Sequence, residues 1–548
     1  MPRPTSALLG TIVAIAAITT VTTASAQTGP PAIAIVPLPT SLTPGTGVFT
    51  LTASTPIVAD AAFRAQARQL VSMLAPATGF DLQILAGKVS KGPHIAFTQQ
   101  KALAGTLGEE GYRLEVTPQA IVIRAAEPAG AFYAVQTLRQ LFPSAVFRES
   151  VVKGVAWEAP GVTVEDTPRF RWRGGHLDVS RYFQPKEFVK KYLDLLALHK
   201  MNRFHWHLTD DQGWRLEVKQ YPKLTQIGAW RKETLVGHYR ELGREFDGKR
   251  HGGFYTQDDV REVVAYAAER FITVVPEIEM PGHSQAIITA YPELGSTDQK
   301  VEVGTIWGIQ PYLLNVEPAT ITFMQNVLTE VMDLFPGPWI HVGGDEAVKT
   351  QWKANPRIQA RMKELGVKSE EELQSWFIRQ MDAFLTSKGR RLIGWDEILE
   401  GGLAENATVM SWRGLEGAIA AARTGHDTVL TPTSHTYFDY YQAKNQNAEP
   451  LAIGGFLPLD KVYTWEPMPD SIEPQFQKHV LGVQGQVWTE YVPNAKAAEY
   501  MAFPRLIALA EVAWTPTAQR KWDEFRARLG PHLERLRILD VNFRPLDQ

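Results

Sequence analysis

Acidic and tryptophan side chains recur from Asp178 onward, and most of them directly follow short apolar runs. Sugars present apolar ring faces that stack on indoles, and hydroxyl groups that need charged acceptors. Cleavage of a glycosidic bond needs a carboxylic acid that protonates the leaving oxygen and a second group that stabilises the oxocarbenium ion. Residues of these types therefore predict a carbohydrate site. They are Asp178, Asp210-Asp211, Glu277, Glu279, Asp345-Glu346, Trp395-Asp396-Glu397, Trp412-Arg413 and Trp488-Thr489-Glu490.

The run Gly343-Gly344-Asp345-Glu346 is the most informative of these motifs. Two glycines before adjacent acids allow close backbone approach and unusual dihedral angles at the end of a strand. Adjacent residues of a regular strand point to opposite sides, so a turn has to reorient one of the two carboxylates. The alternative is a glycine turn in which Asp345 caps the following helix. Spacing alone does not show which carboxyl group is the general acid, because the motifs supply several acidic pairs.

Eight apolar, strand-like runs precede the acids and tryptophans and must position them. Helical patterns lie between the runs, such as Phe188, Tyr192, Leu195 and Leu196 on one helical face. Eight strand–helix units predict an α/β protein with a (β/α)8 TIM barrel over residues 167–548, with its active site at the C-terminal ends of the strands. The runs are Gly175–Val179, Phe204–Leu208, Thr273–Ile278, Trp339–Val342, Leu392–Gly394, Val409–Trp412, Val429–Thr431 and Val483–Trp488.

Residues 27–166 predict a small α+β domain in front of the barrel. Tyr112–Val116 and Ile121–Ile123 flank Thr117-Pro118-Gln119, which is the pattern of a β-hairpin. This part of the chain holds no cluster of catalytic residue types, so we expect it to serve as a packing domain. A helical face follows the hairpin, made of Ala131, Phe132, Val135, Leu138 and Leu141.

Composition excludes several classes of function. The net charge is only −3 and no block is strongly basic, so we expect neither a nucleic acid partner nor binding to an anionic membrane surface. The sequence contains no cysteine. Disulfides, thiolate zinc sites, iron–sulfur clusters and cysteine nucleophiles are therefore excluded.

The N-terminus has the pattern of a signal peptide over residues 1–26. Arg3 supplies a weak positive start, residues 7–21 are mostly apolar, and Ala24-Ser25-Ala26 is a small-residue cleavage site. The alternative is a transmembrane anchor, but threonines interrupt the apolar run, which is short for a span. We expect an exported protein, periplasmic or secreted, without membrane insertion after the signal is cleaved.

The run His341–Glu346 resembles the signature of glycoside hydrolase family 20, the β-N-acetylhexosaminidases. The resemblance covers essentially the mature chain, including the small domain before the barrel, and its motifs follow the family's order. It implies exo-hydrolysis of terminal, non-reducing N-acetylhexosamines (GlcNAc or GalNAc) from oligosaccharides or glycoconjugates, without a cofactor or a metal. The other motifs are Arg173–Arg181, His205–Arg215, Pro276–His283, Gly394–Glu397, Ser411–Gly414, Tyr437–Asp439 and Trp488–Glu490.

The resemblance also implies a retaining, substrate-assisted mechanism, in which the substrate's own 2-acetamido oxygen attacks C1 and forms an oxazolinium intermediate. Glu346 is then the general acid and later the base. Asp345 orients the acetamido nitrogen and stabilises its developing positive charge, while Tyr437 hydrogen-bonds the acetamido oxygen. His283 and Asp210 form a polar relay behind Glu346, with Asp211 as the alternative to Asp210.

The remaining implied residues bind the terminal sugar. Three tryptophans enclose the acetamido methyl group, an arginine and a glutamate grip the hydroxyls with an aspartate nearby, and a fourth tryptophan completes the substrate-binding set. In that order they are Trp395, Trp412 and Trp488, then Arg173 and Glu490 with Asp439, and Trp465.

One rival interpretation is a metal-dependent hydrolase of the barrel amidohydrolase type. His205 and His207 lie on one side of a strand, and His283, His341 or His435 would complete the ligand set. This interpretation leaves the carboxylates and tryptophans unexplained.

Two further alternatives stay within sugar chemistry. A non-catalytic sugar-binding protein would keep the tryptophans without needing the Asp345-Glu346 pair. An ordinary double displacement would use Glu490 as the nucleophile. The polar segment Leu235–Phe254 either covers the site or forms a solvated surface, and its sequence does not choose between the two.

Overall fold

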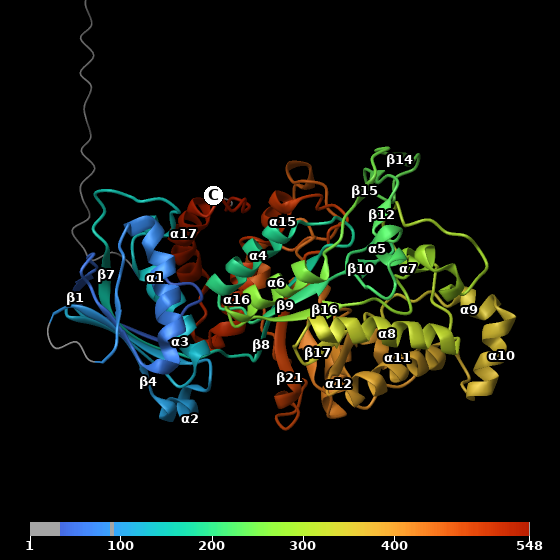
Figure 1. The fold of residues 1–548 in the computed structure, drawn as a ribbon, viewed down its shortest axis with the longest axis horizontal. Coiled ribbons are helices and arrows are strands. Elements are labelled where there is room, and N and C mark those ends of the chain that lie inside the picture. Colours follow the sequence, from blue (N-terminus) through green and yellow to red (C-terminus); the bar gives the residue numbers. More distant parts are fainter. Residues whose placement is uncertain (1–32, 88–91, 547–548) are drawn as a thin grey trace, which may run out of the picture. The chain divides into compact units, whose positions relative to one another are not determined.

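The computed structural model describes residues 33–87 and 92–546. The predicted signal peptide, residues 1–26, lies outside this range. By their contacts the residues from Ile33 onward form one unit, in which a small sheet precedes a closed barrel (Figure 1). In the part of the chain that the structure describes, no helix is long and apolar enough to cross a membrane.

The N-terminal part is a seven-stranded mixed sheet with the strand order β1-β7-β5-β6-β4-β2-β3. The predicted hairpin is confirmed, because β5 and β6 pair in antiparallel with Val116 opposite Ile121. Helices α1 (Arg64–Thr78) and α3 (Pro128–Leu141) contact each other and pack on the sheet (Figure 1). The strands are β1 (Ser41–Thr50), β2 (Ile57–Ala59), β3 (Ile84–Leu85), β4 (His94–Gln99), β5 (Tyr112–Val116), β6 (Ala120–Ala125) and β7 (Glu158–Asp166).

The second part is a closed barrel of eight strands in which every neighbouring pair is parallel. The predicted (β/α)8 fold is therefore confirmed, and each of the eight predicted runs overlaps one barrel strand. The strands are β8 (Trp172–Asp178), β9 (Arg203–His207), β16 (Thr273–Glu277), β17 (Trp339–His341), β18 (Arg391–Trp395), β19 (Thr408–Ser411), β20 (Thr428–Leu430) and β21 (Val480–Gly485).

Helices cover the barrel because one face of each is apolar. In α4 the buried residues include Phe188, Val189, Tyr192 and Leu196, which recur at helical spacing. The principal helices are α4 (Lys186–Leu198), α6 (Gln257–Ala268), α8 (Pro318–Leu334), α11 (Glu370–Ser387), α12 (Glu416–Arg423), α16 (Arg505–Trp514) and α17 (Trp522–Ile538).

Shorter elements lie in the connections. The helices are α2 (Ala104–Leu107), α5 (Lys223–Gln226), α7 (Gln285–Ala290), α9 (Thr350–Ala354), α10 (Pro356–Leu365), α13 (Thr433–Thr436), α14 (Leu459–Tyr463) and α15 (Ala495–Ala502). The strands are β10 (Thr209–Asp210), β11 (Gly213–Trp214), β12 (Trp230–Arg231), β13 (Leu235–Val236), β14 (Glu245–Phe246) and β15 (His251–Gly252).

Buried polar contacts join the small sheet to the barrel. Lys200, which precedes β9, lies 2.7 Å from Asp166 at the end of β7, and both side chains are fully buried. The other Asp166 oxygen accepts a hydrogen bond of 2.8 Å from the indole of Trp514. Breaking such a pair leaves an unpaired buried charge and costs about 3–5 kcal/mol. These contacts therefore hold the two parts of the chain together.

Candidate active site

A cavity of about 450 Å³ lies at the C-terminal end of the barrel. Residues at or after the ends of all eight barrel strands line it, so the closed sheet brings together segments that are far apart in sequence. Its lining residues are Arg181, Tyr239, Arg240, His283, Gly308, Ile309, Asp345, Glu346, Trp395, Trp412, Thr433, Tyr437, Asp439, Tyr440, Ile453, Trp488 and Glu490.

Asp345 and Glu346 both line the cavity because the turn after β17 is unusual. Gly343 and Gly344 have φ values of 65° and 94°, and Glu346 itself has a φ of 47°. A Cβ atom on Gly343 would lie 1.8 Å from an oxygen of Glu279, so only glycine fits there. Helix α9 begins after its N-cap residue Lys349, which rules out Asp345 as its cap. The predicted turn thus directs two adjacent acids into one cavity.

The His283 side chain lies between two pairs of acids. Its Nε2 atom is 3.6 Å from an oxygen of Asp345 and 3.5 Å from an oxygen of Glu346. Its Nδ1 atom is 3.2 Å from Asp210, which meets the geometry of a hydrogen bond, and 3.3 Å from Asp211. Burial alone would lower the pKa of His283, but the charges of Asp210 and Asp345 raise it well above its usual value. The predicted relay residues are therefore in contact, and both aspartates approach the imidazole.

Burial also perturbs Asp345, whose side chain is only 13% exposed. Desolvation raises its pKa, His283 opposes the increase, and the charge of Glu346 adds to it, giving a pKa of about 6. One of its oxygens, Oδ1, is buried and has no hydrogen-bond partner among the described residues. A ligand N–H group that enters the cavity would satisfy this oxygen.

Arg173 is not part of this site, and the prediction that it grips substrate hydroxyls is wrong. It is the second residue of β8, its side chain is fully buried, and its guanidinium donates to Glu110 of the small domain at 2.8 and 3.0 Å. The arginine of this motif that lines the cavity is Arg181, three residues beyond the end of β8. It lies 2.8 Å from Asp210 and 3.9 Å from Glu490. Both arginines belong to the motif Arg173–Arg181. Active-site residues of a (β/α)8 barrel lie at or after the C-terminal ends of the strands, and this rule favours Arg181 as the cavity residue.

Three of the four predicted tryptophans form the aromatic wall of the cavity. The rings of Trp395 and Trp488 are 5.8 Å apart, and Trp412 stacks on Tyr437 at 6.2 Å. The indole of Trp412 donates to Glu397 at 2.9 Å, which fixes its orientation. Trp465, by contrast, does not line the cavity and its prediction is wrong. It is buried in the hydrophobic core and stacks on His435 at 5.2 Å.

Asp439 and Glu490 also line the cavity; Asp439 is buried and the Glu490 side chain is 11% exposed. Oδ1 of Asp439 and Oε2 of Glu490 have no hydrogen-bond partner within the described part of the chain. Burial and then the charge of Glu490 raise the pKa of Asp439 well above its usual value. Burial also raises the pKa of Glu490, while Arg181 opposes that increase. Unpaired buried oxygens are costly, so hydroxyl groups of a ligand would bind favourably here.

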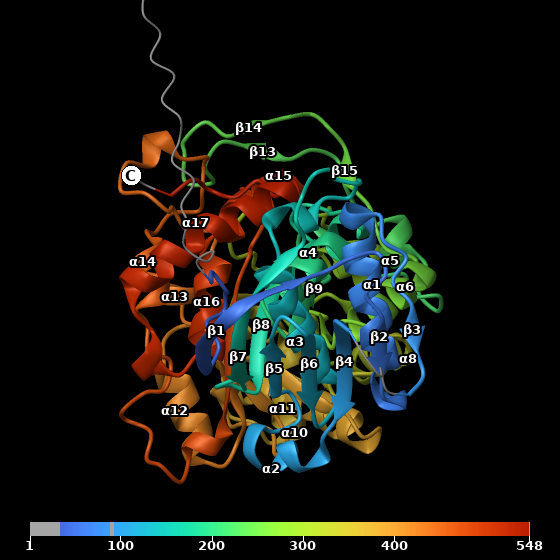
Figure 2. The same cartoon turned by 90° about the vertical axis from the view of Figure 1, so that its left-hand side faces the viewer.

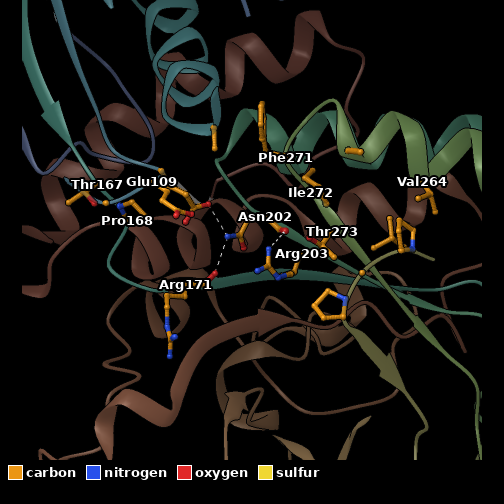
Figure 3. Close-up of a pocket in the computed structure, with 18 of the residues that line it drawn as sticks. Glu109, Thr167, Pro168, Arg171, Asn202, Arg203, Val264, Phe271, Ile272 and Thr273 are labelled. Atoms are coloured by element: carbon orange, nitrogen blue, oxygen red, sulfur yellow. Dashed lines mark hydrogen bonds between the residues drawn. The ribbon is translucent and has the colours of Figure 1, made fainter. Parts of the chain in front are cut away.

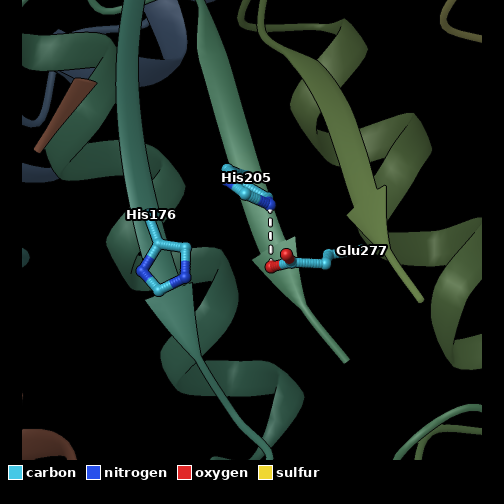
Figure 4. A group of neighbouring side chains, drawn as sticks. All are labelled: His176, His205 and Glu277. Carbon is cyan, nitrogen blue, oxygen red and sulfur yellow. Dashed lines mark ion pairs between the residues drawn. The ribbon is translucent and has the colours of Figure 1, made fainter. Parts of the chain in front are cut away.

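A buried cluster centred on Glu277 lies beneath the tryptophan wall. Its carboxylate is 3.0 Å from His205 (Figure 4). The same carboxylate is 2.8 Å from His341 and accepts a hydrogen bond of 2.7 Å from Trp395. His207 also contacts Glu277 and lies 3.0 Å from Asp210. The cluster thus orients Trp395 and connects it to the Arg181–Asp210 pair.

The five histidines invoked by the metal interpretation do not form one ligand set, because they are divided among three places. His205, His207 and His341 all face the Glu277 carboxylate, His283 faces Asp345 and Glu346, and His435 stacks on Trp465. Among the described residues, the groups with enough closely spaced ligand atoms for a cation are His176–His205–Glu277, His207–Glu277–Glu279, Asp210–Asp211–His283 and His283–Asp345–Glu346. The acids of these groups already face histidines, except Glu279, whose two carboxylate oxygens have no hydrogen-bond partner among the described residues.

A second hollow of about 860 Å³ lies between the small domain and the N-terminal ends of the barrel strands (Figure 3). Glu109, Thr167, Asn202, Arg203 and Phe271 are among the residues that line it. Its described lining includes no tryptophan and no histidine. Although it is larger, it therefore lacks the side chains that bind and cleave a sugar.

The segment Leu235–Phe254 contributes to the site and also reaches solvent. Strands β13 and β14 form a hairpin within it, with Leu235 opposite Phe246. Tyr239 and Arg240, at the tip of the hairpin, line the cavity, whereas Leu242 is fully exposed. Each of the two predicted alternatives thus applies to part of the segment: Tyr239 and Arg240 lie at the site, and Leu242 belongs to a solvated surface.

A parallel (β/α)8 barrel with paired acids and a tryptophan wall at its carboxyl end is the arrangement of a barrel glycoside hydrolase. Residues 170–517 match the family model described as glycosyl hydrolase family 20, catalytic domain, and residues 32–167 match the model described as glycosyl hydrolase family 20, domain 2. The chain belongs to glycosyl hydrolase family 20.

Known members of the family resemble the chain over nearly all of its length. It is 43% identical to a β-hexosaminidase of Porphyromonas gingivalis over 93% of this chain and 64% of that protein. The chain therefore spans less than two thirds of that relative's length. The structure of a GH20 β-N-acetylhexosaminidase from Streptomyces coelicolor A3(2) matches with a TM-score of 0.81 at 33% identity, covering 94% of this chain and 98% of that one. A GH20 exo-β-N-acetylglucosaminidase from Vibrio harveyi, in complex with N-acetylglucosamine, matches with a TM-score of 0.80 at 35% identity, covering 94% and 78%.

Proposed function

We propose that the protein is an exo-acting β-N-acetylhexosaminidase that removes terminal N-acetylglucosamine or N-acetylgalactosamine from glycans or chitooligosaccharides. The observation that carries this proposal is the turn after β17, which directs two adjacent carboxylates into one tryptophan-lined cavity. Oxygens of Asp345 and Glu346 lie within 4.8 Å of each other. The N-acetylglucosamine bound by the Vibrio harveyi relative supports the choice of sugar.

The separation of the two carboxylates restricts the mechanism. Inverting glycosidases keep their two carboxyl groups about 6.5–9.5 Å apart, because an attacking water must fit between them and the sugar. Asp345 and Glu346 are closer than this, and both face the same ring nitrogen of His283. Two acids on one side of a cavity suit neighbouring groups of one sugar, namely the leaving oxygen and the 2-acetamido group.

We therefore assign the steps as follows. The acetamido oxygen forms a bond to C1 while the bond from C1 to the leaving oxygen breaks, and Glu346 transfers its proton to that oxygen. Ionised Asp345 accepts a hydrogen bond from the acetamido N–H group and stabilises the positive charge of the oxazolinium ring. Glu346 then takes a proton from water, whose oxygen bonds to C1 as the ring opens. Two inversions at C1 give a product of retained configuration.

Several other residues have supporting roles in this proposal. Tyr437, beside Trp412 and Trp488, would donate to the acetamido oxygen, and the tryptophan wall would enclose the methyl group. Arg181, Asp439 and Glu490 would bind hydroxyl groups. We prefer the substrate-assisted mechanism to double displacement by Glu490 because Asp345 and Glu346 are adjacent and suit neighbouring groups of one sugar.

Product analysis tests the proposal directly. Chitin oligomers labelled at the reducing end should lose single sugars from the non-reducing end, so the label should pass through each shorter length in turn. Aryl β-N-acetylglucosaminide and β-N-acetylgalactosaminide should be cleaved, whereas the matching aryl β-glucoside, which has no acetamido group, should be almost inert. Early release of mid-chain fragments, or comparable turnover of the glucoside, would overturn the proposal.

We also propose that the protein is exported. The support is the arrangement of Arg3, the apolar residues 7–21 and the Ala24-Ser25-Ala26 site. Mass spectrometry of the protein recovered outside the cytoplasm should find an N-terminus at Gln27. Recovery of the intact N-terminus in the cytoplasmic fraction would contradict export.

A further inference from the structure

The β13–β14 hairpin places a cation at the mouth of the candidate active site. Arg240 lines the cavity together with Glu346, but it lies on the connection after β9, far from the acids in sequence. The hairpin is labelled in Figure 2. Its tip therefore lines the same cavity as Glu346, the residue that protonates the leaving oxygen in the proposed mechanism.

The tip of the hairpin is anchored to two other loops of the barrel. His238 stacks on Tyr491 with ring centres 5.3 Å apart and an interplanar angle of 7°. The His238 ring also lies 3.1 Å from the carbonyl oxygen of Ile453, and the backbone N–H of Tyr239 donates to the Tyr491 hydroxyl at 3.0 Å. These contacts hold the two residues that precede the arginine in place.

The Arg240 side chain is exposed, and within the described part of the chain its side-chain hydrogen bond is to the neighbouring Tyr239. Its Nε atom donates to the hydroxyl of Tyr239 at 2.9 Å, and its guanidinium lies 5.2 Å from the Tyr239 ring. No carboxylate forms an ion pair with it among the described residues. The exposed acids on the same hairpin, Glu241 and Glu245, are not paired with it either. The outer face of the guanidinium is thus available to an anion.

Apolar groups lie beside this cation. Ile309 lines the cavity and is 52% exposed, and the preceding Gly308 lies beside the Tyr239 ring, since a Cβ atom on it would be 3.4 Å from that ring. An aromatic ring and an isoleucine side chain offer the apolar surface on which a sugar ring packs. The planar guanidinium fork matches the geometry of a carboxylate.

We propose that Arg240 selects leaving groups that carry a carboxylate, so that the enzyme prefers N-acetylhexosamine linked to an acidic sugar such as a hexuronic acid. This inference rests on the proposed exo-hydrolase function. Tyr239 and Ile309 hold the ring of the leaving sugar, and Arg240 binds its carboxylate. Arg240 is a specificity-determining residue and takes no part in bond cleavage.

The test uses two disaccharides that differ in one group. Both carry β-linked N-acetylglucosamine, joined in one case to glucose and in the other to glucuronic acid with the same linkage. The measured quantity is the ratio of kcat/KM for the acidic disaccharide to kcat/KM for the neutral one. In the wild type at low ionic strength we expect a ratio of roughly two to five, which corresponds to about 0.4–1 kcal/mol, the range for an exposed charge pair. High salt should reduce this ratio, because it screens exposed charges.

Three variants of the hairpin complete the test. Arg240→Gln should bring the ratio to about one, and Arg240→Lys should give an intermediate value because it keeps the charge without the fork. Arg244→Gln makes the same change of charge on the same hairpin at an exposed position outside the cavity lining, and should keep the wild-type ratio. A matching sulfated disaccharide tests whether the site discriminates carboxylates from other anions. If kcat/KM relative to the neutral disaccharide is higher for the sulfated than for the carboxylated substrate, the assignment to carboxylates is overturned.

The outcomes separate this inference from the proposed function. If the wild type cleaves neither disaccharide, nor aryl β-N-acetylglucosaminide, the proposed function itself fails. If it cleaves the neutral disaccharide but the ratio is one, or is unchanged in Arg240→Gln, only the inference about Arg240 fails. A change in the pH profile of Arg240→Gln that is equal for both disaccharides, with an unchanged ratio, would instead assign the arginine to tuning of Glu346 and would overturn the inference.

Discussion

Replacement of Asp345 by asparagine tests the electrostatic part of the mechanism. The side chain is buried, 3.6 Å from His283, and the substitution keeps its shape while removing its charge. At about 3 Å and an effective dielectric constant of about 20, two unit charges attract by about 5.5 kcal/mol. The positive charge is spread over the oxazolinium ring and asparagine keeps a dipole, so we expect a loss of roughly 3–4 kcal/mol. This corresponds to a decrease in kcat of about 10²–10³.

The pH dependence gives a second, independent measurement. Burial raises the pKa of Asp345 to about 6, so the carboxylate is protonated below that pH and ionised above it. Since the proposed mechanism needs the ionised form, wild-type kcat/KM, which reports pKa values of the free enzyme, should rise with pH through about 6. Asparagine does not titrate, and this acidic limb should be absent from the pH profile of Asp345→Asn.

The assay is the initial rate of aryl β-N-acetylglucosaminide hydrolysis between pH 4 and pH 9, with thermal unfolding of each variant as a control. A raised carboxyl pKa means that ionisation above pH 6 opposes folding, so Asp345→Asn should not lower the Tm at pH 7. Asp298→Asn makes the same chemical change at an exposed position and should keep the wild-type profile. A loss of less than tenfold, or an unchanged acidic limb in Asp345→Asn, would refute the role assigned to the charge.

Three further predictions address the acid, the nucleophile and the two arginines. Glu346→Gln should lower kcat by about 10²–10⁴ on glycosides with poor leaving groups and far less on activated aryl glycosides, and equal losses on both would remove Glu346 from the acid role. Successive fluorination of the N-acetyl methyl group should lower the rate of hydrolysis with each fluorine, and NMR should show a product of β configuration. A rate that does not change with fluorination, together with a sugar ester trapped on Glu490, would establish an enzyme nucleophile. Arg181→Met should lower kcat/KM at temperatures where the variant is folded. Arg173→Met should lower the free energy of unfolding by about 3–5 kcal/mol in urea titrations and leave kcat/KM of the folded enzyme near wild type, and the opposite pattern would contradict the placement of the two arginines.

The barrel was predictable because its strands are short apolar runs followed by polar residues of few types. Boundaries were less accurate, as in β21, which spans Val480–Gly485 where the pattern predicted Val483–Trp488. Trp488 is apolar and extends the run in sequence, but its side chain lines the cavity beyond the last ladder residue. An apolar residue that serves a binding site is indistinguishable from a core residue when only the pattern is available.

The error at Arg173 has a geometric cause. Arg173 and Asp178 belong to the same strand and are five residues apart, which is about 17 Å in an extended chain. A motif that spans a whole barrel strand therefore contributes residues to both ends of the barrel. Only the position of each residue along the strand tells which end it occupies, and on that criterion Arg181, beyond the last strand residue, belongs to the cavity.

Several cavity residues carried no signal in the sequence. They come from long connections without periodicity, where neither spacing nor residue type indicates proximity to the acids. Their positions depend on contacts between loops, such as the stacking of His238 on Tyr491, which only the folded chain creates. These residues are Tyr239, Arg240, Gly308, Ile309, Thr433, Tyr440 and Ile453.

The positions of His283 and Glu346 also depend on tertiary support. Both residues have a backbone φ of 47°, which is unfavourable for residues other than glycine and costs about 1–3 kcal/mol each. Their two turns pack directly on each other, since a Cβ atom on Gly282 would lie 2.9 Å from the backbone oxygen of Asp345. Neither turn is favourable by itself, but together they hold the imidazole 3.5 Å from the Glu346 carboxylate. Local sequence preferences oppose both conformations, so the geometry of the acid follows from the packing of two barrel loops.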